Sequence, residues 1–131
     1  MKKFLTPLLA IVLLFTACGK DDPPAPAATL VGKWTLDQTI IKEYVNNAVV
    51  SSITIPSDGT TFDFQGNGNL VITHPGNVLE SMPYTIQPNS KVNIDGDVFD
   101  VQSLTTTNVT IYHRQDLSAG EYDEVIVKLK R

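Results

Sequence analysis

Apolar and polar residues alternate with a period of two from Leu30 to the end of the chain. Because successive side chains of a strand point to opposite faces, this alternation is typical of strands with one buried face. After residue 29, no stretch has the 3.6-residue periodicity of an amphipathic helix. The first segment is long, and its mostly apolar face is formed by Leu30, Gly32, Trp34, Leu36, Gln38, Ile40 and Tyr44.

Shorter alternating segments follow, separated by residues that favour turns. Gly66-Asn67-Gly68-Asn69 and Asp95-Gly96-Asp97 are hairpin signals because these residues tolerate positive φ. Residues 115–120 are expected to form a loop. Eight or nine short strands joined by tight turns predict an all-β fold, a small antiparallel up-and-down barrel, since closure removes exposed sheet edges. The expected strands after the first are 49–55, 61–65, 70–74, 79–87, 91–95, 98–104, 109–114 and 122–130.

The first 29 residues have a different composition. A basic start, Met1-Lys2-Lys3, precedes an apolar run over 4–17 that is shorter than the roughly 20 residues needed to span a bilayer. This is the pattern of a cleaved secretory signal, predicted to be residues 1–17. Prolines then hold residues 18–29 extended as a tether. Residues 30–131 form the folded domain in this interpretation.

Cys18 is the only cysteine and stands where the apolar run stops. Phe15-Thr16-Ala17-Cys18 resembles the lipobox of bacterial lipoproteins. The resemblance implies cleavage before Cys18, a diacylglycerol on its thiol and a further acyl chain on its new amino group. Two or three chains would hold the protein firmly on a membrane. The alternative is an ordinary secreted protein with a free thiol.

The residues after the cysteine bear on location. Lys20, Asp21 and Asp22 resemble the export signal of Bacteroidetes surface lipoproteins, which implies a lipid anchor in the outer membrane with the domain facing outward. The alternative is a solvated linker. Removing residues 1–17 takes two lysines from 10 basic residues and nothing from 14 acidic ones, leaving a net charge of −6. An acidic chain without a basic cluster favours neither nucleic acid nor electrostatic membrane binding, so acyl chains would make the membrane contact.

The ordered motifs of residues 30–131 resemble the lipocalin-like domains of Bacteroidetes lipoproteins. The motifs are Gly32-Lys33-Trp34, Phe62-Asp63-Phe64 with Gly66-Asn67-Gly68, Tyr84-Thr85-Ile86, Asp95-Gly96-Asp97, and Leu104-Thr105 before Val109-Thr110-Ile111. The resemblance implies a barrel floor in which Gly32 admits the chain and an arginine stacks on Trp34. Arg131 is the candidate arginine and Arg114 the alternative. The domain is shorter than these relatives and lacks their C-terminal helix.

Five aromatic residues are expected to point into the barrel: Trp34, Phe62, Phe64, Tyr84 and Phe99. Two interpretations are open. The aromatic residues either line a cavity for an apolar ligand or fill the interior as a core, and an eight-stranded barrel is wide enough for either.

Candidate catalytic and metal-binding residues are few. His74 and His113 have no acidic neighbour in sequence, and Asp95, Asp97 and Asp100 lack the spacing of a calcium loop, so no catalytic residue, metal or cofactor is predicted. The first functional hypothesis is a lipid-anchored module that binds a small apolar ligand or a glycan fragment. The second is a non-enzymatic accessory of an outer-membrane complex with a filled core. An enzyme is disfavoured.

Overall fold

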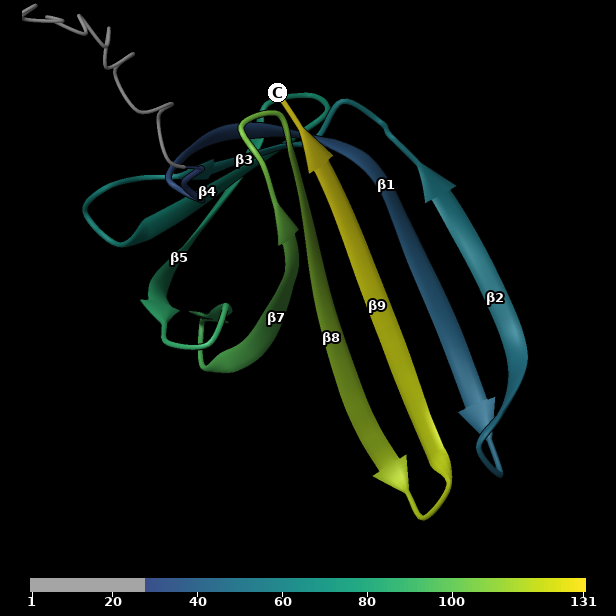
Figure 1. Ribbon diagram of the computed structural model, residues 1–131. Coiled ribbons are helices and arrows are strands. Elements are labelled where there is room, and N and C mark those ends of the chain that lie inside the picture. The colour runs from purple at the N-terminus through teal and green to yellow at the C-terminus, as the bar shows by residue number, and fades with distance from the viewer. Residues whose placement is uncertain (1–27) are drawn as a thin grey trace, which may run out of the picture.

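The computed structural model describes residues 28–131, which form nine antiparallel strands and no helix (Figure 1). Within that range, no helical segment has the length and apolar character needed to cross a bilayer. Cys18 and the segment Lys20-Asp21-Asp22 lie outside the described residues, as does the leader. The strands are β1 (Gly32–Val45), β2 (Ala48–Pro56), β3 (Thr61–Phe64), β4 (Asn69–His74), β5 (Val78–Gln87), β6 (Lys91–Ile94), β7 (Asp97–Leu104), β8 (Asn108–Ser118) and β9 (Glu121–Lys130).

Eight of these strands close into a barrel. From β3 to β9 each strand pairs with the next, and β1 closes the ring by pairing with both β3 and β9. The start of β1 (Gly32–Thr35) lies along β3, and Thr35–Tyr44 lies along β9. The prediction of an all-β antiparallel barrel is therefore confirmed. The strand outside the ring is β2, which pairs with β1 beyond the point where β3 ends.

Four long strands extend beyond the barrel as a sheet in the order β2-β1-β9-β8 (Figure 1). Asn46 and Asn47 both have positive φ (53° and 59°), as a two-residue type I′ hairpin requires. The Asn47 N–H donates to the Gly120 carbonyl at 3.0 Å, which joins the two hairpin tips. The loop predicted over 115–120 is wrong. β8 continues to Ser118 because β9 supplies backbone partners along its whole length.

A β-bulge at Asp37 changes which residues of β1 face inward. Leu36 and Gln38 pair with consecutive residues of β9, so Asp37 is the extra residue. One extra residue shifts the alternation, so every residue after the bulge faces the side opposite to the one that strict alternation predicts. The predicted single face is therefore wrong beyond Leu36, because Ile40 and Tyr44 lie on the outer face of the extended sheet.

The bulge lies where β1 changes its neighbours. Up to Thr35 the strand pairs with β3, and from Gln38 onward β2 takes that place. Bulges bend strands and are common at barrel rims. Here the bend redirects β1 from the barrel wall into the extension, and Lys130 Nζ donates to Asp37 Oδ1 at 2.6 Å.

The end of the barrel near the C-terminus, here called the floor, is filled by closely packed side chains. Its residues are 5% exposed or less, and Phe64 meets Tyr84 edge to face with ring centroids 5.1 Å apart. The Tyr84 hydroxyl donates to the Gln65 carbonyl at 2.7 Å, which satisfies its polar atom. The residues of this floor layer are Trp34, Phe64, Leu70, Tyr84, Val92, Val109 and Leu129.

Candidate functional site

The structure brings the three predicted floor residues together. The guanidinium carbon of Arg131 lies 3.7 Å from the centroid of the Trp34 ring, a cation–π contact. The Trp34 Nε1–H donates to the Leu30 carbonyl at 2.8 Å. Gly32 has φ of 123°, and a Cβ there would lie 3.2 Å from Arg131 Nη1. The alternative arginine, Arg114, does not contact Trp34. Its guanidinium stacks instead on the aromatic ring of Tyr122 in the extended sheet.

The five predicted aromatic residues divide between two layers. Trp34, Phe64 and Tyr84 belong to the packed floor, whereas Phe62 and Phe99 are partly buried in the layer above. That upper layer surrounds a half-open cavity of about 160 Å³, here called the mouth cavity. It is lined by Phe62, Phe64, Leu70, Ile72, Met82, Ile94, Phe99, Ile111 and Val127.

Every side chain lining the mouth cavity is apolar. A hydroxyl or amide placed there would lose its hydrogen bonds to water without replacement, at a cost of roughly 1–3 kcal/mol. A dry apolar cavity of about 150 Å³ is known to hold benzene. The mouth cavity therefore suits one ring or a short hydrocarbon group without polar atoms.

One side of the barrel rim is polar. By strand alternation, His74 and Glu80 share the inner face of β4 and β5 with Ile72 and Met82, and each lies two residues along its strand from one of these cavity-lining residues. His74 Nε2 lies 3.2 Å from Glu80 Oε1, an ion-pair distance without hydrogen-bond alignment. His74 Nδ1 lies 3.5 Å from the hydroxyl oxygen of the buried Thr60.

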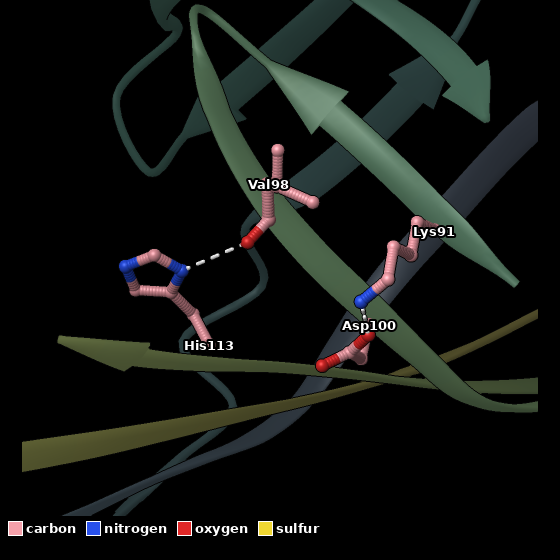
Figure 2. Close-up of polar contacts among 4 residues, drawn as sticks. All are labelled: Lys91, Val98, Asp100 and His113. Carbon is pink, nitrogen blue, oxygen red and sulfur yellow. Dashed lines mark hydrogen bonds and ion pairs between the residues drawn. The ribbon is translucent and has the colours of Figure 1, made fainter. Parts of the chain in front are cut away.

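The other side of the rim is formed by His113, which follows Ile111 on the inner face of β8. Its Nδ1 lies 3.1 Å from the Val98 carbonyl oxygen (Figure 2). Because a carbonyl only accepts, Nδ1 carries the proton in this contact, and Nε2 of the neutral ring is left as an acceptor. The His113 ring also packs on Phe99, with centroids 4.7 Å apart. By strand alternation both histidines therefore share an inner face with cavity-lining residues, His74 with Ile72 on β4 and His113 with Ile111 on β8.

The three aspartates considered for calcium do not form a site. Asp100 is paired with Lys91 across β6 and β7 (Figure 2). Asp95 has φ of 52° and lies in the hairpin turn before β7. Within residues 28–131, no three histidine, cysteine, aspartate or glutamate side chains gather as metal ligands.

Sequence reasoning missed a cluster on the outer face of the extended sheet. Tyr44 stacks on Tyr122 with centroids 4.3 Å apart, and the Arg114 guanidinium lies 3.6 Å from the Tyr122 ring centroid. Glu124 accepts hydrogen bonds from the Tyr44 hydroxyl (3.0 Å) and the Tyr112 hydroxyl (2.9 Å). Burial and the hydrogen bond to Glu124 raise the pKa of Tyr112 to about 12.

This outer cluster ties together three strands of the extension, β1, β8 and β9. Cross-strand aromatic and charged pairs stabilise a sheet by roughly 0.2–1 kcal/mol each. Its sequence signal was the tyrosines at 44, 112 and 122, but the bulge at Asp37 had to be known before Tyr44 was placed on this face.

A larger groove of about 410 Å³ lies at the floor end of the barrel. It is lined by Ala28, Thr29 and Leu30, where the described chain begins, and by residues of β5, the β5–β6 turn, β6 and β7. Its lining mixes apolar side chains with Lys91 and Gln102. The smaller mouth cavity is the better candidate site, because its walls are uniform and lie inside the barrel.

Comparison with protein-family models, with curated proteins and with solved structures finds no match to this chain. The function is therefore inferred from the chemistry and geometry of the chain itself.

Proposed function

We propose that this protein is a membrane-anchored binding module whose barrel mouth takes the apolar end of a small ligand. The observation that carries the proposal is the mouth cavity, which is lined only by apolar side chains, while His74, Glu80 and His113 share the inner faces of β4, β5 and β8 with its lining residues. Ligand sites in proteins combine these features, with apolar walls for affinity and a few polar groups for orientation.

The volume of the cavity limits the kind of ligand that can bind. A cavity of about 160 Å³ is below the usual 300–1,000 Å³ of drug-sized sites, so only one end of the ligand is enclosed. The enclosed end is a hydrocarbon ring or short chain. The polar end then lies at the rim, within reach of His74, Glu80 and His113. A glycan fragment fits less well, since its hydroxyls would have no partners inside.

The proposed location is supported by the first residues of the chain. An apolar leader that ends in Phe15-Thr16-Ala17-Cys18 supports acylation of Cys18. The acidic composition gives no other means of holding an anionic membrane surface. Lys20, Asp21 and Asp22 support display on the outside of the outer membrane. We expect no enzymatic activity, because the His74–Glu80 pair lies at an open rim and not inside a cleft.

The second hypothesis, an accessory of an outer-membrane complex, is favoured by one observation. The floor of the barrel is filled, and β2 exposes Val49, Val50, Ile53 and Ile55. Exposed apolar residues gathered on one element are typical of protein interaction surfaces. A protein that bound its partner only through β2 would have no need of a ligand in the barrel.

Native mass spectrometry of the full chain purified from its own host separates the two hypotheses. The first predicts a co-purified small molecule of mixed apolar and polar character. Ile72→Trp, which places an indole in the cavity, should abolish that added mass. Val71→Trp is the matched control, because Val71 precedes Ile72 on β4 and points to the outer face. An unliganded wild type, or equal loss in both variants, would contradict ligand binding.

A further inference from the structure

The free edge of β2 has the features of a self-pairing surface. We propose that two copies of this protein pair β2 with β2 in antiparallel fashion, which joins their extended sheets into one. The strand order would then run β8-β9-β1-β2 in one protomer and β2-β1-β9-β8 in its partner. This inference does not depend on the barrel holding a ligand.

Within residues 28–131, β2 pairs with β1 alone and lies at the outer edge of the extension (Figure 1). A strand at a sheet edge leaves a row of backbone N–H and C=O groups available for another chain. Proteins usually block such edges with charged side chains or central prolines. The sequence of Ala48–Pro56 is AVVSSITIP, which contains no charged residue and places proline only at its end.

The opposite edge of the same extension is blocked. Beyond Tyr112, β8 carries Arg114 and Asp116, which form an ion pair with Nη2 and Oδ1 2.8 Å apart. A bulge at Leu117 further disrupts the strand. Because charges and bulges both oppose strand addition, pairing is favoured at β2 and disfavoured at β8.

The geometry of β2 defines the register. Its pairing with β1 has a bulge at Val50, and Pro56 has no N–H to donate. The regular stretch between them is Ser51–Ile55, whose centre is Ile53. A two-fold axis through this centre places Ile53 opposite its own copy and Ser51 opposite the partner's Ile55. Such an interface is isologous, the commonest kind in homodimers.

The side chains and charges favour a second copy as the occupant. Ile53 and Ile55 are 53% and 45% exposed, and they share the cavity-side face of the sheet with Ile41. Paired residues of adjacent strands lie on the same face, so a copy would continue this apolar strip. The whole chain has a net charge of −4, which disfavours most self-contacts. The uncharged edge of β2 lets two such chains approach without like charges.

Disulfide trapping in membranes tests this register. In the full chain, Ile53→Cys should give a cross-linked dimer on mild oxidation, because residues paired directly across antiparallel strands have Cα atoms roughly 4.5–5.5 Å apart. Ile55→Cys is the matched control on the same face. Its copies would lie four residues apart along the strand, roughly 13 Å, beyond the reach of a disulfide. The wild type, whose only cysteine is Cys18, gives the background.

The proposal requires at least tenfold more dimer from Ile53→Cys than from Ile55→Cys. Equal cross-linking of the two variants, or none in either, would overturn it. Sedimentation of the full chain in detergent gives a second, independent measurement. The wild type should sediment as a dimer and Ile53→Lys as a monomer, with unchanged fluorescence of the buried Trp34 showing that the barrel is intact. A monomeric wild type would also overturn the proposal.

Discussion

The guanidinium of Arg131 lies 3.7 Å above the ring of Trp34, so the last residue of the chain covers the start of β1. Arg131 Nη2 also donates to the Thr29 carbonyl at 2.8 Å. These contacts hold the first and last strands of the barrel, β1 and β9, together at the floor. Closure of the ring and packing of the floor layer are thus linked through this pair.

Trp34→Ala should destabilise the protein by about 3–5 kcal/mol, the usual cost of removing a fully buried large aromatic side chain. Trp34 has no exposed surface and contacts the rest of the floor layer. Urea unfolding followed by circular dichroism measures the change. A loss below about 1 kcal/mol would show that the indole does not support the barrel.

Arg131→Ala should cost about 1–2 kcal/mol, from the cation–π contact and the hydrogen bond to Thr29. Lys130→Ala is the control, since its ion pair with Asp37 is exposed and such pairs contribute about 0–1 kcal/mol. The same unfolding experiment compares the two variants. If Arg131→Ala is no more destabilising than Lys130→Ala, the stacking contributes nothing measurable to closure.

Stability should fall at high pH because of the outer cluster. Burial and the hydrogen bond to Glu124 raise the pKa of Tyr112 to about 12, above its ordinary value of 10.0. The folded state therefore favours the protonated phenol. This contribution to the free energy of unfolding is fully present below pH 10 and is lost as pH rises through 12, and because Tyr112 is partly exposed to screening solvent it amounts to about 1–2 kcal/mol.

The measurement is the free energy of unfolding at several pH values between 9 and 12. The hydrogen bond to Glu124 also raises the pKa of Tyr44, which adds to the loss in the same direction. Tyr112→Phe should make the pH dependence shallower over this interval. An unchanged slope in that variant would show that the Tyr112–Glu124 hydrogen bond does not form in solution.

Cys18→Ser should move the protein from the membrane fraction to the soluble fraction, because a serine hydroxyl does not replace the thiol that takes the lipid. Fractionation of host cells followed by immunoblotting measures this. Lys20→Ala is a useful companion, because it leaves the cysteine intact and should alter only display at the cell surface. Retention of Cys18→Ser on membranes would rule out acylation as the anchor.

The sequence predicts much of this fold because its strands are amphipathic and its turns are chemically distinct. Asp95-Gly96 was predicted to form a hairpin turn, and both residues have the positive φ that such a turn requires. The bulge at Asp37 was not predictable, because it arises where β1 exchanges β3 for β2 as its neighbour. Such an exchange depends on contacts between distant strands and leaves no local pattern.

The candidate site was predictable only in part. Alternation places Phe62 and Trp34 inward alike, but one lines the mouth cavity and the other fills the floor. Trp34 and Phe62 are direct partners of β1 and β3, so their different depths along the barrel axis arise from the tilt of strands in a closed barrel and not from periodicity. The approach of Glu80 to His74 likewise needs the register of β4 with β5.

The most direct measurement is the methyl resonance of Met82 during titration of the full chain with benzene. Met1 and Met82 are the only methionines, and Met82 lines the mouth cavity. With ¹³C-methyl-methionine labelling, we predict a saturable shift of the Met82 signal, strongly reduced in Ile72→Trp and preserved in Val71→Trp. A Met82 signal that does not move at the solubility limit of benzene would contradict the account, since the barrel mouth would then hold no apolar group.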